Sequence, residues 1–190
     1  MTRNRLAHFL SDLFSPWLVN AGFFLILGLH TGSWPSAIVA ALGTGPAIRV
    51  VILWKMRSGS VSNHHVTNRQ QRGPLFVIIT VIVLTLLAVL AILPTPHLIW
   101  AGMGSALVFL IGFGLVTMVG KIKASIHVGL WACLITFLGL TVSPWWCVGY
   151  LVTPVIAWSR MVIKHHTLTE VIAGIATGAV VTSLAVWFFL

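Results

Sequence analysis

The chain has 190 residues, of which 58% are hydrophobic and 7% are charged. Its mean hydropathy of +1.05 lies outside the range of soluble globular domains, so the composition excludes an ordinary water-soluble enzyme and predicts an integral membrane protein. The formal net charge of +9 arises from 11 Lys and Arg residues against two carboxylates, which excludes any chemistry that needs several acidic side chains.

The N-terminal stretch MTRNRLAHFLSDLF has basic residues before an apolar segment, as a signal peptide does. No small-residue cleavage site precedes the next polar stretch, so we expect it to remain as an uncleaved first segment. Apolar runs then lie near 16–30, 35–54, 74–93, 97–119, 127–142, 144–158 and 171–190. Because a helix needs about 20 apolar residues to cross a bilayer, we predict an all-α, polytopic membrane helical bundle with six or seven transmembrane helices. The connectors are too short for a separate folded unit, which predicts a single domain over residues 1–190.

If the runs cross in turn, the N-terminus, the 55–73 and 120–126 connectors and the 159–170 stretch emerge on one side. The basic residues all lie there or close by: Arg3, Arg5, Arg49, Lys55, Arg57, Arg69, Arg72, Lys121, Lys123, Arg160 and Lys164. Short positively charged loops remain in the cytoplasm, so we expect an integral cell membrane protein with this basic face inside the cell. Anionic membrane lipids suit such a face as partners, whereas no recognition helix or stacking platform indicates nucleic acid.

Two polar clusters precede apolar runs on this face. In VSNHHVTNRQQRGP, Arg69 and Arg72 are three residues apart, so in a helix they would point the same way and grip one phosphate from two directions. In KIKASIHVG, Lys123, Ser125 and His127 alternate just before an apolar helix. Backbone amides at a helix start, with a hydroxyl and an ammonium nearby, form an anion-binding site.

A third cluster, SRMVIKHHTLTE, places His166 and Glu170 four residues apart, on one helical face. Each cluster alone is equally well explained by interfacial side chains that contact lipid headgroups. Side chains that can donate hydrogen bonds to a phosphate recur together with histidines each time the chain returns to this face. Ionisable residues near membrane depth are functional by default. Together the clusters predict a phosphate site.

The chain's two carboxylates, Asp12 and Glu170, cannot build a two-metal phosphatase site. A histidine-rich metal centre is the remaining metal alternative and would use His64, His65, His127, His165 and His166, but the metalloprotease-type spacings are absent. We therefore expect no metal and no cofactor. In a metal-free site, His166 held by Glu170 would attack phosphorus, and His127 would protonate the leaving oxygen.

These blocks resemble the signature of the type 2 phosphatidic acid phosphatase superfamily, in a divergent bacterial form over roughly residues 61–175. The third block of that family reads S-R, five residues, H, three residues, D, and this chain fits it with Glu170 in place of the aspartate. The second block is commonly P-S-G-H, where this chain has ASIH. The first reads K, six residues, R-P, and the nearest fit here is His65, six residues, Arg72, then Gly73 and Pro74, without the lysine. A long apolar stretch, two of the predicted runs, separates the first two blocks and departs from the usual pattern.

The resemblance implies that His166 forms a phosphohistidine intermediate and that His127 is the general acid. It also implies that Arg72, Arg160 and Ser125 bind the phosphoryl group. From their positions alone we add two phosphate-binding residues, which are Lys123 in place of the absent lysine and Arg69 in support of Arg72.

The predicted function is a metal-independent membrane phosphatase that hydrolyses a lipid phosphate or diphosphate of the phosphatidic acid, phosphatidylglycerophosphate or polyprenyl phosphate type. Two alternatives stay open: a lipid phosphotransferase, in which another hydroxyl replaces water, and a non-catalytic lipid-phosphate binding or transport protein. Gly174 and Gly178 form G-x-x-x-G in the last run, where we expect helices of the same chain to approach, although a homo-oligomer stays an alternative.

Overall fold

The computed structural model describes residues 2–61, 66 and 68–190, and every regular element in this part of the chain is a helix. The elements are α1 Arg3–Leu13, α2 Pro16–Thr31, α3 Trp34–Leu42, the π-helical turn η1 Gly43–Ala47, α4 Ile48–Arg57, the 3-10 turn η2 Arg69–Gln71, α5 Arg72–Leu90, α6 His97–Met118, α7 Ile126–Thr141, the 3-10 segment η3 Pro144–Val152, α8 Thr153–Val162 and α9 Leu168–Phe189. The all-α prediction is confirmed for the described residues.

Local sequence signals set the helix ends. α2 has Pro16 in its first turn, where the missing N–H has no intrahelical partner to lose, and it ends at Gly32, whose φ of 70° is a left-handed conformation that glycine tolerates. α9 begins with a capping box in which Thr167 and Glu170 satisfy each other's backbone N–H groups.

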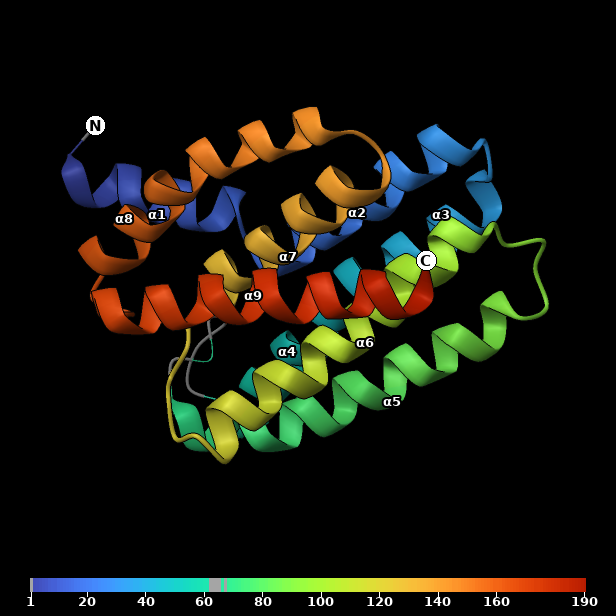
Figure 1. Cartoon of the computed structure of the whole chain (residues 1–190). Coiled ribbons are helices and arrows are strands. Elements are labelled where there is room, and N and C mark those ends of the chain that lie inside the picture. Colours follow the sequence, from blue (N-terminus) through green and yellow to red (C-terminus); the bar gives the residue numbers. More distant parts are fainter. Residues whose placement is uncertain (1, 62–65, 67) are drawn as a thin grey trace.

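α7 is the central helix of the bundle, and most of its residues are buried. It packs against α9, α2, α6, α8 and η3, while α6 packs against α5 and α9 (Figure 1). The main apolar core lies where α2, α6 and α7 meet, around Phe24, Phe113 and Phe137, none of which is exposed.

Four helices in the described residues are long and apolar enough to cross a membrane: Trp34–Arg57, which joins α3, η1 and α4, then α5, α6 and α9. α1 and α2 are bent by 43° and make a fifth crossing if the pair is one span. The predicted six or seven crossings are not confirmed by this count, because α7 has 16 residues and the 144–162 stretch is divided between η3 and α8.

One end of the bundle collects the polar connections (Figure 1). α1, the loop between α6 and α7, and the connection between α8 and α9 lie at this end, and α5 begins there. The α2–α3 turn and the α5–α6 loop lie at the opposite end. We call the first of these the basic end, because the helix ends and loops that carry the Lys and Arg residues meet there.

The two glycines of α9 face α7 within the same chain, as expected from the G-x-x-x-G spacing. A Cβ at Gly174 would come within 2.5 Å of the Ser125 carbonyl oxygen, and one at Gly178 would overlap the Gly129 carbonyl. The two helix backbones therefore touch at these positions, and this close contact fixes how the start of α9 sits against the start of α7.

We expect Gly178→Ala to lower the free energy of unfolding by about 3 kcal/mol or more, because the added methyl group can be accommodated only if two helix backbones separate. The matched control is Gly22→Ala in α2, where nothing lies within 4 Å of the added carbon. This control should be neutral or stabilising by up to about 1 kcal/mol, since alanine favours helix. Thermal unfolding in detergent measures both, and equal melting temperatures for the two variants would contradict the backbone contact.

Candidate functional site

The predicted site residues come from separate segments that meet at the basic end. Arg72 begins α5, Arg160 lies in the last turn of α8, and His166 lies between α8 and α9. Lys123 and Ser125 lie on the loop that leads into α7. Hydrogen bonds and electrostatic contacts then join these segments to one another.

Arg72 is 5% exposed and joins the start of α5 to two other segments. Its Nε donates to the Val66 carbonyl and its Nη1 to the Ala124 carbonyl, both at 3.0 Å. Val66 has φ 47°, which a β-branched residue rarely adopts, so this carbonyl is aimed at Arg72 in a strained conformation. The remaining guanidinium nitrogen, Nη2, is buried and has no hydrogen-bond partner among the described residues.

The α6–α7 loop is held against the start of α9 by two hydrogen bonds. Lys123 Nζ donates to the His165 carbonyl at 2.8 Å, and the Ser125 backbone N–H donates to the Glu170 carbonyl at 3.0 Å. The Ser125 hydroxyl is completely buried and has no hydrogen-bond partner in the described part of the structure. This loop therefore carries both an ammonium and a buried hydroxyl to the neighbourhood of His166.

His166 and Glu170 form the pair that their spacing predicted. His166 Nδ1 lies 3.0 Å from Glu170 Oε2. The same oxygen accepts from the Thr167 backbone N–H at 3.2 Å, and Thr167 Oγ1 accepts from the Glu170 N–H at 3.3 Å. Glu170 thus has two tasks: it begins α9 through the capping box and it orients the imidazole, whose Nε2 points away from the carboxylate.

The surroundings of His166 favour the neutral imidazole. Burial is the largest cause that holds the pKa of His166 far below its ordinary value of 6.5. The positive charges of Arg160, Arg72 and Lys123 lower this pKa further, in that order, and a backbone hydrogen bond to Lys123 raises it. At physiological pH the ring is therefore uncharged, which is the form with an available electron pair.

Arg160 is the largest fully buried side chain among the described residues, with 1% of its surface exposed. Its Nη1 donates to Ser11 Oγ, which joins α8 to α1, and its Nε is buried without a partner in the described part of the chain. Arg72 lies near enough to repel its charge and Asp12 near enough to attract it. Two buried guanidinium groups that repel each other are unfavourable unless an anion lies between them.

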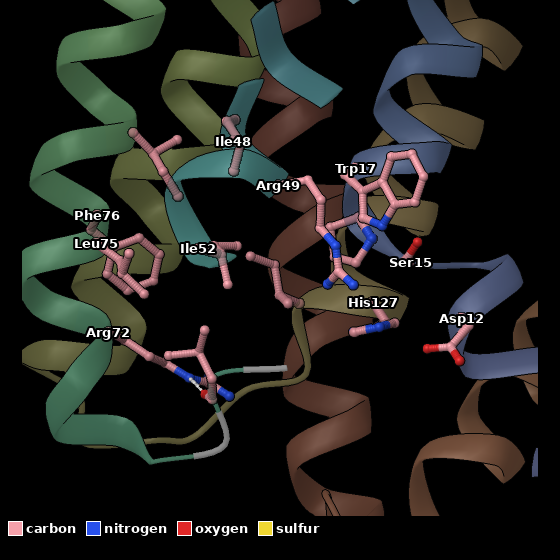
Figure 2. A pocket seen from close by; sticks show the side chains of 14 residues that line it. Asp12, Ser15, Trp17, Ile48, Arg49, Ile52, Arg72, Leu75, Phe76 and His127 are labelled. Carbon is pink, nitrogen blue, oxygen red and sulfur yellow. Dashed lines mark hydrogen bonds between the residues drawn. The ribbon is translucent and has the colours of Figure 1, made fainter. Parts of the chain in front are cut away.

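A cavity of about 450 Å³ adjoins this cluster, between the α1–α2 junction, α4, α5 and the start of α7. Arg72 and His127 line it, together with Asp12 and Arg49, and Figure 2 shows how these side chains lie. His127 is 2% exposed, and it occupies the first turn of α7, directly after Ser125 and Ile126. The cavity thus reaches two of the predicted site residues.

The other predicted side chains lie outside the cavity lining. They are Lys123, Ser125, Arg160, His166 and Glu170. All of them are connected with Arg72 or with each other by the hydrogen bonds and electrostatic contacts above. The site therefore consists of a buried cationic cluster around His166 and a cavity that adjoins this cluster at Arg72 and is also lined by His127.

Some predictions fall outside what the structure describes. His65, the nearest fit to the first family block, and His64 lie outside the described residues. Arg69 begins η2, but its side chain lies outside the described part. Among the residues that are described, no three His, Cys, Asp or Glu side chains are grouped as metal ligands. The histidine metal centre considered above needs His64 and His65 and is untested.

Arg49 is a cavity residue that sequence reasoning counted only among the basic residues of one face. It lies in α4, just after a π-helical turn that contains Pro46. Such turns occur often at functional sites, and a proline inside an apolar run is the sequence signal that would have pointed there.

Comparisons with known proteins identify no relative of this chain. No protein-family model matches the chain, and neither a curated protein nor a solved structure matches it.

Proposed function

We propose that this chain is a metal-independent membrane phosphatase of the type 2 phosphatidic acid phosphatase kind, which hydrolyses a lipid phosphate or diphosphate through a phosphohistidine intermediate. One observation carries the proposal: Arg72, Arg160 and Lys123 converge on a neutral histidine that is held by a carboxylate. Buried donors without described partners lie on Arg72, Arg160 and Ser125. Buried donors of this kind require an explanation, and a phosphate group supplies the oxygen acceptors that they lack.

In the first step, His166 Nε2 attacks the phosphorus atom, a P–N bond forms, and the P–O bond to the leaving group breaks. His127 gives a proton to the leaving oxygen, so the lipid departs as an alcohol, or as a monophosphate if the substrate is a diphosphate. Glu170 keeps the proton on Nδ1 and stabilises the positive charge that develops on the ring. Each cation or hydroxyl that binds the transferring group contributes about 3 kcal/mol to the transition state.

In the second step, water attacks the phosphorus atom of the phosphohistidine. A P–O bond forms, the P–N bond breaks, and the proton lost by the water passes to His127, which restores the acid for the next cycle. One water molecule is consumed and inorganic phosphate is released, so both histidines return to their starting states.

The proposal also covers the number of membrane crossings and the side of the membrane that the basic end faces. We propose that α7 and the η3–α8 stretch complete a set of seven crossings and that the basic end faces the cytoplasm. α7 is apolar and central, and the turns at the opposite end of the bundle carry no Lys, Arg, Asp or Glu. The substrate would then be a membrane lipid whose phosphate lies at the cytoplasmic surface.

Phosphate release by the purified protein in detergent, with EDTA present, tests the function. The substrates are phosphatidic acid, phosphatidylglycerophosphate, and a polyprenyl monophosphate and diphosphate. The expected result is release of phosphate from at least one of them. The matched control is His97→Asn, an exposed histidine at the opposite end, which should behave as the unmodified protein. Tight binding without any release would support the lipid-phosphate binding alternative instead.

The charge around His166 predicts a pH effect. The imidazole must be neutral to attack, and the charge of Lys123 helps to keep it neutral by lowering its pKa. In Lys123→Met the pKa of His166 should rise, so the acidic limb of the kcat/KM profile should move to higher pH than in the unmodified protein. Both profiles use the same substrate, so the titration of its phosphate affects them equally.

A loss of activity alone would not distinguish this electrostatic role from a structural one, whereas the position of the limb does. The control is Lys121→Met on the same loop, since Lys121 is exposed and is not among the charges that act on His166. An acidic limb at the same pH in Lys123→Met and Lys121→Met would contradict the assignment.

A further inference from the structure

Arg49 is a cationic side chain in the membrane helix Trp34–Arg57. The direction in which it points depends on an irregular turn of the helix just before it. The π-helical turn η1, Gly43–Ala47, directly precedes α4. A π-helical turn adds one residue to the helix and so rotates everything after it by about 100°. Asn20 Nδ2 donates to the Thr44 carbonyl at 3.4 Å within this turn. The irregular turn therefore decides which way Arg49 points.

Arg49 points into the cavity, toward His127. Figure 2 shows its guanidinium at the same end of the cavity as the imidazole, beside Trp17. Within the described residues, Arg49 has no hydrogen bond and no ion pair. Asp12 lines the same cavity but lies within electrostatic reach of Arg160. The cavity wall thus carries two arginines, Arg49 from α4 and Arg72 from α5.

The α4 and α5 sides of the cavity wall are otherwise apolar. Ile48 and Ile52 of α4 face Leu75, Phe76 and Ile79 of α5 across it. A cavity lined by two arginines and by an aliphatic wall, between two membrane helices, matches a lipid headgroup followed by its hydrocarbon chain.

The position of the cavity relative to the histidines identifies which part of a substrate it would hold. In phosphoryl transfer the attacking and leaving atoms lie roughly in line through phosphorus. If His166 attacks and His127 protonates the leaving oxygen, the leaving group lies on the His127 side. The cavity includes His127 and excludes His166, so it is the space for the leaving group.

We infer that Arg49 binds a second phosphate on the leaving group, so that the preferred substrate is a lipid with two phosphates: a lipid diphosphate, or a monoester joined to a phosphodiester as in phosphatidylglycerophosphate. This rests on the proposed function and goes further, because that function leaves the substrate class open. A substrate that leaves as a neutral alcohol, such as phosphatidic acid, offers Arg49 no anion. An unpaired guanidinium beside an aliphatic wall is then left without compensation for its lost hydration.

The test compares pairs of substrates with the same hydrocarbon tails: a polyprenyl diphosphate with its monophosphate, and phosphatidylglycerophosphate with phosphatidic acid. We expect kcat/KM to favour the two-phosphate member of at least one pair. In Arg49→Met this ratio should fall by about 10- to 100-fold, the value of a hydrogen bond to a charged group. Arg49→Lys should restore part of it. Arg57→Met, an exposed arginine at the end of α4 that does not line the cavity, is the matched control and should keep the ratio.

The outcomes separate this inference from the proposed function. If lipid phosphates are hydrolysed but Arg49→Met keeps the unmodified ratio, the second phosphate site is wrong and the phosphatase stands. If nothing is hydrolysed, the phosphatase is wrong, and calorimetric binding of inorganic pyrophosphate and inorganic phosphate tests Arg49 alone. Tighter binding of pyrophosphate that is lost in Arg49→Met would support the site, and equal affinities in the two proteins would overturn it.

Discussion

Replacing His166 by asparagine is expected to abolish phosphate release, with kcat lower by about 10⁴-fold or more, as for loss of the nucleophile in other covalent mechanisms. The side chain lies at the centre of the cationic cluster and its Nδ1 is held by Glu170. Asparagine keeps a polar group of similar position but cannot accept a phosphoryl group.

Two readouts make the His166 result specific. A rapid quench with a substrate carrying labelled phosphate should trap a protein-bound label that is stable in alkali and lost in acid, as a P–N bond is. His166→Asn should carry no label, although its melting temperature in detergent should stay near that of His97→Asn. Labelled His166→Asn protein, or full turnover by it, would remove His166 from the role of nucleophile.

Glu170→Gln separates the two tasks of Glu170. Glutamine can still complete the capping box with Thr167, so the stability of α9 should change little. It lacks the charge that stabilises the imidazolium and fixes the tautomer, so kcat should fall by about 10²- to 10⁴-fold. A large loss of stability with little loss of kcat would instead assign Glu170 to the cap alone.

Most of the helical architecture follows from local sequence. The run predicted near 97–119 is α6 His97–Met118, and the run near 127–142 is α7 Ile126–Thr141, because long apolar stretches bounded by Pro, Gly and polar residues leave little choice of structure. The count of crossings is harder, because it depends on length. The run near 144–158 contains Pro144 and Pro154 and divides into η3 and α8, which composition alone does not reveal.

The candidate site likewise has parts that the local sequence predicts and parts that only the tertiary fold brings together. His166 and Glu170 were paired from their spacing, but the expected shared helical face is wrong: His166 precedes α9, and the pair forms at the N-terminal cap of that helix. The contacts of Arg72 with the Ala124 carbonyl and of Arg160 with Ser11 join segments that only the tertiary fold brings together, so no local pattern predicts them. The position of Arg49 depends on the π-helical turn before it, and a regular helix would have pointed it elsewhere.

Replacing Arg160 by methionine should lower activity and raise stability at the same time. Arg160 is 1% exposed, repelled by Arg72, and has one guanidinium nitrogen without a partner among the described residues. Replacement of buried charges by apolar side chains of similar length is often neutral or stabilising by about 1 to 4 kcal/mol. The same change removes a donor to the transferring phosphoryl group, so kcat should fall by about 10²- to 10³-fold.

Two contacts of Arg160 oppose this gain: methionine leaves the buried Ser11 hydroxyl without its donor, and it removes the positive charge that attracts Asp12. The double variant Ser11→Ala with Arg160→Met removes the Ser11 penalty and should melt at least as high as Arg160→Met alone. Arg57→Met makes the same chemical change at an exposed position of α4 and should alter neither quantity. A melting temperature well below that of the unmodified protein in both Arg160 variants would mean that Arg160 mainly stabilises the packing of α1 against α8. In a site that binds an anion, the buried cations repel one another when the anion is absent. Removing one of these cations therefore raises stability and lowers catalysis.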